Sequence, residues 1–155
     1  MKKILVSFLV LTLILLSGCN DQATESNGAS SEDNRKSLAL VYESVITDDS
    51  SEISSVYKAC KRYNEQIGNE FRHYVPQDYQ YENLLNTLNN AVVDGYDAVA
   101  FYGDGYADFV SSVAGEFPNI TFILFGTIKE ISPHVNIYCC DGTTDKNAFL
   151  EQVLL

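Results

Sequence analysis

Several carboxylates stand in a polar segment that directly follows an apolar run. The run is LALVY (residues 38–42), and the segment after it is ESVITDDSSE (residues 43–52). Two nearby carboxylates can perform acid–base chemistry, and carboxylate and hydroxyl groups can also hold a ligand through hydrogen bonds. Glu43 and Ser44 follow the run directly and are the first candidates for ligand contact, with Asp48 as a further one.

The end of this polar segment has the spacing of a helix start. Asp49 stands three residues before Glu52, as in a capping box, where two side chains satisfy unpaired backbone N–H groups of the first helical turn. A structural role in capping is therefore favoured for Asp49 over acid–base chemistry.

A second loop combines two glycines with a carboxylate. Gly103-Asp104-Gly105 follows the apolar run AVAFY, and Tyr106 comes next. The loop lacks the third glycine of a dinucleotide fingerprint and the Lys-Ser/Thr of a phosphate loop, and it places a carboxylate where phosphate would approach. A phosphate cradle is therefore disfavoured. Asp104 either caps the helix that follows or accepts hydrogen bonds from a neutral hydroxylated ligand, and Tyr106 is a second candidate contact.

The potential nucleophiles and general bases of the sequence do not stand in any known catalytic motif. No Ser, Cys or Thr stands in a nucleophile-elbow pattern, and neither His73 nor His134 follows a strand-like run in the position of a general base. The histidines also lack ligand spacing to each other or to a cysteine, which disfavours a zinc site. The sequence predicts a protein that is not an enzyme and needs no metal or cofactor.

The cysteines do not suggest a disulfide framework. Beyond Cys19 there are three, Cys60, Cys139 and Cys140, an odd number. Cys139 and Cys140 are adjacent in a strand-like run, so their side chains should point to opposite faces. We expect small buried thiols rather than a metal-binding pair.

The elements that must position these residues alternate between short apolar runs and longer helical periodicities. Gly68, Gly95 and Pro118 stand where the helices should stop. Strand–helix alternation requires right-handed crossovers and predicts an α/β fold, a three-layer sandwich with a mainly parallel sheet in flavodoxin-like strand order. The expected strands cover residues 38–42, 71–75, 98–102, 121–125 and 135–140, and the expected helices lie within residues 53–67, 81–92 and 106–117.

In such a sheet, ligands bind beyond the carboxyl ends of the strands, near the point where the strand order reverses. The loops at that edge are residues 43–50, 76–79, 103–105, 126–133 and 141–145. A binding site is therefore expected among these loops.

Composition and charge limit the class of partner. The 155 residues are 46% hydrophobic and 12% aromatic, enough for one domain with a real core. The net charge is −11, and without Lys2 and Lys3 the chain has 8 basic and 21 acidic residues, or −13. Binding to a phosphate backbone depends on clustered Lys and Arg, and the longest basic cluster, Lys58, Lys61 and Arg62, is typical of a solvated helix face. Nucleic acid is not an expected partner.

The first residues are typical of an export signal. Two lysines precede an apolar run over residues 4–16, which is closed by Leu-Ser-Gly-Cys ending at Cys19. This pattern resembles the lipobox of bacterial lipoproteins, which implies a signal peptide over residues 1–19, a lipid on Cys19, and a place at the extracytoplasmic face of the bacterial cell membrane. The alternative is an uncleaved signal anchor with an incidental cysteine, although the run is short for a membrane span.

The segment after Cys19 differs in composition from the rest of the chain. Residues 20–37 contain almost nothing apolar and are rich in Ser, Asn, Asp and Glu, so they cannot bury enough surface to fold. We expect a disordered polar tether there and an α/β ligand-binding lobe over residues 38–155.

Taken together, the motifs resemble one family. LALVYESVITDDSSEISSVYKACKRY is similar to the first strand, acidic loop and first helix of the basic membrane protein family, also called the purine-nucleoside-receptor-like group. YVPQDYQYENLLNTLNNAVVDGYDAVAF, YADFVSSVAGEFPNITFILFG and NIYCCDGTTDKNAFL resemble its later segments in order. The resemblance covers nearly all of residues 38–155 and implies the architecture of a type I periplasmic binding protein.

The resemblance also implies a function. Such proteins capture a small solute, typically a purine nucleoside, in a cleft between two lobes and deliver it to the permease of an ABC importer. Binding would close the lobes by a hinge motion without covalent chemistry. An ABC permease, a small solute and the membrane, reached through the lipid, are the implied partners.

Some positions depart from the family pattern. Glu43 keeps the acidity expected after the first strand, but the family's stacking aromatic falls on Glu52, the Asn after it on Ile53, and an aspartate after the fourth strand on Gly126. The chain also ends at Leu155, inside the helix that follows the fifth strand, so we expect a truncated, single lobe. A lipoprotein interaction or sensor module with a degenerate solute site is the alternative.

Overall fold

The structure, a computed structural model, describes residues 34–43, 50–126 and 134–155. The predicted lipidation site Cys19 lies outside the described residues, as do residues 20–33 of the expected tether, Ser44 and Asp48. The prediction of disorder was wrong for the end of that segment, because Ser37 is buried and its hydroxyl donates to Asp97 Oδ2 at 2.8 Å. Within the described residues, no helix has the length and apolar character needed to cross a membrane.

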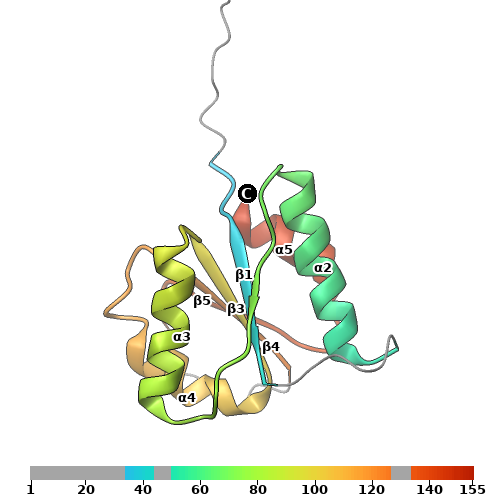
Figure 1. Cartoon of the computed structure of the whole chain (residues 1–155). Coiled ribbons are helices and arrows are strands. Elements are labelled where there is room, and N and C mark those ends of the chain that lie inside the picture. Colours follow the sequence, from blue (N-terminus) through green and yellow to red (C-terminus); the bar gives the residue numbers. More distant parts are fainter. Residues whose placement is uncertain (1–33, 44–49, 127–133) are drawn as a thin grey trace, which may run out of the picture. The chain divides into compact units, whose positions relative to one another are not determined.

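Five parallel strands form one sheet in the order β2-β1-β3-β4-β5 (Figure 1). This is the predicted flavodoxin-like order. The three central strands have the predicted bounds, whereas β2 and β5, the two edge strands, are shorter than expected. The elements are β1 (Leu38–Tyr42), α2 (Glu52–Gln66), β2 (His73–Tyr74), α3 (Tyr81–Val93), β3 (Ala98–Tyr102), η1 (Asp104–Tyr106), α4 (Ala107–Val113), β4 (Thr121–Phe125), β5 (Ile137–Cys140) and α5 (Lys146–Leu154).

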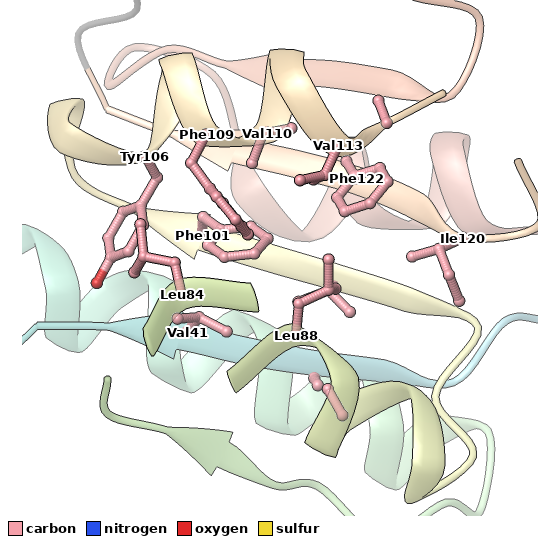
Figure 2. Close-up of a cluster of buried hydrophobic side chains, with 14 of the residues drawn as sticks. Val41, Leu84, Leu88, Phe101, Tyr106, Phe109, Val110, Val113, Ile120 and Phe122 are labelled. Atoms are coloured by element: carbon pink, nitrogen blue, oxygen red, sulfur yellow. The ribbon is translucent and has the colours of Figure 1, made fainter. Parts of the chain in front are cut away.

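Helices cover both faces of the sheet, which confirms the three-layer sandwich. Figure 1 shows α3 and α4 on one face and α2 and α5 on the other. Side chains alternate between the faces along each strand: Val41, Phe101 and Phe122 pack against α3 and α4 (Figure 2), while Leu40 and Ile123 pack against α2 and α5. Burial on both faces explains why the central strands are continuous apolar runs.

The start of α2 differs from the prediction. Its N-cap is Ser51, whose hydroxyl oxygen accepts a hydrogen bond from the Ser54 N–H at 3.2 Å. Glu52 is the first residue of the helix, too early for its side chain to close a capping box. The predicted capping box was therefore wrong, and Asp49 itself lies outside the described residues.

The third helix is shorter than the apolar spacing suggested. A 3-10 turn precedes α4, and α4 ends at Val113. The Asn136 side-chain amide, from the approach to β5, donates to the carbonyl oxygens of Ala114 and Phe117 at 3.2 Å and of Ile120 at 3.0 Å. A distant side chain therefore satisfies carbonyl groups that a longer helix would have paired internally.

The two adjacent cysteines point to opposite faces, as predicted. Cys140 is buried beside α2 and α5, but Cys139 is exposed. The expectation that both are buried was wrong for Cys139, because β5 is the last strand of the sheet and the face on which Cys139 lies is only partly covered there.

One buried side chain fixes where the sheet begins. Asn64 of α2 is fully buried, and its amide donates to the carbonyl oxygens of Leu38 at 2.8 Å and Cys60 at 3.0 Å. Its oxygen accepts from the Leu38 N–H at 3.1 Å. Asn64 thus pairs both backbone groups of the first residue of β1 and joins them to α2.

We expect Asn64→Ala to lower the free energy of unfolding by about 3 kcal/mol, because it leaves buried backbone groups of Leu38 without partners. Urea unfolding followed by circular dichroism measures the change. Asn86→Ala, at an exposed position of α3, is the matched control and should change stability by less than about 0.5 kcal/mol. Equal effects of the two substitutions would contradict the assigned role.

Candidate functional site

The carboxyl ends of the central strands meet around a hollow of about 420 Å³. Glu43 follows β1, Gly103-Asp104-Gly105 follow β3, and Gly126 follows β4. Strands β1 and β3 are neighbours, so the strand order reverses between them, and ligands of such sheets bind at this switch point. Tyr79, from the loop before α3, together with Glu52 and Tyr102 completes the lining.

A larger hollow, of about 660 Å³, lies between α2 and the start of α5. Its lining includes Lys58, Lys61, Arg62 and Lys146. Lys61 pairs with Glu65 at 3.8 Å, and Lys146 lies 4.0 Å from Glu52. Size alone favours this hollow, but it is away from the switch point and has no aromatic side chain in its lining, so the hollow at the strand ends is the better candidate for a solute site.

Tyr79 is the most exposed aromatic side chain of this site, with 44% of its surface accessible. Its hydroxyl donates a hydrogen bond to the Glu43 carboxylate. Its ring contacts that of Tyr106, with centroids 5.1 Å apart and planes 47° apart. The ring lies directly over Gly105, because a Cβ placed there would be 2.6 Å from Tyr79 Cε1. Gly105 thus leaves the space that Tyr79 occupies.

The other two glycines of the site are required by the backbone. Gly103 and Gly126 have φ of +122° and +130°, values that side chains other than glycine rarely adopt. The Gly103 N–H donates to the Phe125 carbonyl oxygen at 3.1 Å, which joins the ends of β3 and β4. The glycine-rich loop is therefore a tight turn at the strand ends with an aromatic ring above it.

Asp104 lies beside Gly126 across this turn. A Cβ at Gly126 would be 3.4 Å from Asp104 Oδ1. The capping alternative was wrong, because Asp104 is the first residue of the 3-10 turn and neither that turn nor α4 has a side-chain cap hydrogen bond. The ligand alternative for Asp104 stays a prediction.

Tyr106, the other predicted ligand contact in this loop, is fully buried. Its ring packs on Phe101 with centroids 5.3 Å apart, on the core side of the loop (Figure 2). Tyr79 thus lines the hollow, and Tyr106 contacts the Tyr79 ring from the core side. Direct contact between Tyr106 and a solute stays a prediction.

The phenols of the site are held in their neutral form. Burial, the hydrogen bond to Glu43 and the Glu43 charge raise the pKa of Tyr79 to about 12. Burial, followed by the charges of Glu52 and Asp104, raises the pKa of Tyr102. Each phenol therefore keeps its proton at neutral pH and can act as a hydrogen-bond donor.

Glu43 and Asp104 are the predicted site residues that the structure brings together at the hollow. Sequence reasoning missed Tyr79 and Tyr102 and assigned Glu52 to helix capping. Tyr79 lies in the loop over residues 76–79, which the fold prediction placed at the binding edge, so its aromatic character was a usable signal. Among the described residues, no group of His, Cys, Asp and Glu side chains has an arrangement that could hold a metal ion.

A family model matches residues 35–153, nearly the whole described part of the chain. Its description is ABC transporter substrate-binding protein, PnrA-like. The chain belongs to this family. Membership confirms the resemblance found in the sequence. A family of ABC transporter substrate-binding proteins supports a solute-binding role and implies an ABC permease as partner. The family binds substrates without catalysis, which fits a protein that is not an enzyme.

Solved structures show the same fold at low sequence identity. A candidate lipoprotein from Peptoclostridium difficile 630, solved as a fragment, matches with a TM-score of 0.61 and 16% identity over 77% of this chain and 96% of its own. A solute-binding protein of an ABC transporter from Aeropyrum pernix K1 matches with a TM-score of 0.55 and 16% identity, over 66% of this chain and 27% of its own.

A third match, a transcriptional activator of the comK gene from Bacillus halodurans, has a TM-score of 0.53 and 15% identity, over 66% of this chain and 33% of its own. The chain thus spans about a third or less of these last two proteins. No curated protein sequence matches the chain. At these identities the likeness shows the fold alone.

We expect Gly105→Ala to displace the Tyr79 ring, because the new methyl group would overlap it. Loss of the ring-current shifts between Tyr79 and Tyr106 in NMR spectra measures the displacement. Stability should change by less than about 1 kcal/mol, since an exposed side chain can swing away. Gly115→Ala is the control, because its nearest neighbour, His134 Cε1, is at an ordinary 3.6 Å. Unchanged Tyr79 resonances in Gly105→Ala would contradict the steric role.

Proposed function

We propose that the chain is a membrane-anchored substrate-binding lipoprotein of an ABC importer, and that it captures a small solute at the hollow by non-covalent contacts. The observation that carries the proposal is the exposed Tyr79 ring held beside Glu43 and Asp104 at the switch point of a sheet of this family. A purine nucleoside is the first candidate solute, because the sequence resembles the purine-nucleoside-receptor-like group.

The lining offers the contacts that a nucleoside needs. The Tyr79 ring is an exposed aromatic surface on which a flat base can stack. The carboxylates of Glu43 and Asp104 can accept hydrogen bonds from base N–H groups or ribose hydroxyls, and the Tyr102 hydroxyl can donate one. Glu52 replaces the family's stacking aromatic, and in this proposal Tyr79 supplies an aromatic ring from a different loop.

The described lobe would provide one wall of an interlobe cleft. In the family a solute is captured between two lobes, and closure follows from contacts that exist only when both lobes touch it. Cys19, lipidated, would hold this lobe at the membrane near its permease through the polar segment that follows it.

A second function has specific support. Glu52, Ile53 and Gly126 stand where the family has ligand-binding residues, which favours an interaction or sensor module that contacts a membrane partner. Crosslinking in cells followed by co-purification separates the two functions. A sensor module would capture a kinase or a permease to the same extent with and without added solute. An importer component would capture a permease to an extent that depends on the solute.

We expect the full chain, purified in detergent, to bind adenosine, guanosine or inosine in isothermal titration calorimetry. Tyr79→Ala should weaken that binding about tenfold, because stacking of a base on an aromatic ring is lost. Tyr138→Ala is the control, since Tyr138 is a partly exposed tyrosine on β5 outside the hollow. Absence of binding by a folded chain, or equal loss in both variants, would remove the assignment of nucleosides to this site.

A further inference from the structure

We infer that the hollow at the strand ends prefers a solute that carries a positive charge, such as an ammonium or amidinium group, over a neutral or anionic solute of the same shape. This inference rests on the proposed function, in which the hollow holds a solute. It adds to that function a preference for positively charged solutes, and an unmodified purine nucleoside is neutral.

Charge is distributed unevenly over the lining. Three carboxylates, Glu43, Glu52 and Asp104, line the hollow, and its described lining contains no Lys or Arg. Lys146 Nζ lies 4.0 Å from Glu52 Oε1 and offsets that charge in part. For Glu43 and Asp104, no cationic partner is found within the parts of the chain that the structure describes. The described lining therefore carries a net negative charge.

The neighbouring phenols respond to the same field. The Glu43 charge acts on the hydroxyls of both Tyr79 and Tyr106, while Glu52 and Asp104 act on that of Tyr102. Burial is the largest cause of each raised phenol pKa, and the carboxylate charges add to it because a second negative charge nearby is disfavoured. A phosphate or carboxylate on a solute would meet the same repulsion, and an ammonium group would be attracted.

An exposed aromatic ring adds an attraction of its own. A cation placed over the face of a tyrosine ring is stabilised by the electrons of the ring. Tyr79 has 44% of its surface exposed, and its hydroxyl is bonded to Glu43, so ring and carboxylate are held together. A solute cation at this point would contact both groups.

Basic residues lie on another part of the described lobe. Lys58, Lys61, Arg62 and Lys146 line the hollow between α2 and α5. Lys146 also lies 4.0 Å from Glu52 of the strand-end hollow, whereas Lys58, Lys61 and Arg62 line the hollow between α2 and α5 only.

The test compares solutes that differ at one atom group. Adenosine is neutral, 5′-amino-5′-deoxyadenosine is a cation at pH 7, and adenosine 5′-monophosphate is an anion on the same skeleton. With the full chain in calorimetry, the amine should bind at least fivefold more tightly than adenosine, and the monophosphate at least fivefold more weakly, as expected for one charge near carboxylates at a solvated site. A smaller preference for the amine, or equal binding of the monophosphate, overturns the inference.

Substitutions locate the charge preference. In Glu43→Gln/Asp104→Asn, the ratio of the adenosine Kd to the amine Kd should fall about fivefold, because two charges are removed while size and shape are kept. Glu116→Gln, at an exposed position beyond α4, is the control and should keep the ratio of the unchanged protein. A ratio that does not fall in the double variant overturns the inference.

Failure of the nucleoside assignment is distinguishable from failure of the charge preference. If adenosine and its two analogues all fail to bind, choline is compared with its neutral isostere 3,3-dimethyl-1-butanol. Tighter binding of choline, reduced in Glu43→Gln/Asp104→Asn, supports the charge preference without the nucleoside. Equal binding, or no binding, of choline and its isostere overturns the charge preference as well.

Discussion

The site depends on the register of three parallel strands. Tyr42 of β1 is paired with Tyr102 of β3, and Tyr102 with Phe125 of β4, so that the three strands end at the same level. The next residues, Glu43, Gly103 and Gly126, are therefore brought together although they are far apart in the sequence. A slip of one residue would also turn every side chain of a strand to the other face. Because both faces are buried, such a slip is strongly disfavoured.

Because the strands end at one level, the backbone of neighbouring strand ends comes close, and the Gly103 N–H donates to the Phe125 carbonyl oxygen at 3.1 Å. Glycines at positions 103 and 126 adopt positive φ at this level, and the glycine at position 105 leaves room for Tyr79. Gly103 and Gly126 are thus required by the backbone conformation, and Gly105 is required by the space that the Tyr79 ring occupies. Close approach of the loops produces the hollow, and the same approach sets carboxylates and tyrosine hydroxyls near one another.

Acidic and basic side chains are unevenly distributed over the described lobe, which its net charge alone does not show. Carboxylates collect at the strand ends, while basic side chains collect between α2 and α5. The two groups meet at one point, where Lys146 Nζ lies 4.0 Å from Glu52 Oε1. For a solute-binding protein, the consequence is that the sign of the solute's charge becomes a selective property of the cleft wall.

The sequence by itself determined the central strands, the strand order and the edge at which a site should lie. It could do so because strands buried on both faces are continuous apolar runs and because parallel connections are right-handed. It also determined the acidic character of that edge, through Glu43 and Asp104. The start of α2 and the end of α4 were less predictable, since Ser51 and Asn136 satisfy their backbone groups through hydrogen bonds.

Only the tertiary structure decided which side chains face the hollow. Tyr106 and Tyr79 are both tyrosines in loops at the binding edge, but Tyr106 is buried against Phe101 while Tyr79 lies exposed above Gly105. The choice depends on contacts between loops that are distant in the chain, and sequence periodicity carries no information about such contacts. The position of the exposed aromatic ring therefore depends on the packing of Tyr79 over Gly105, a residue of another loop, and not on local sequence spacing.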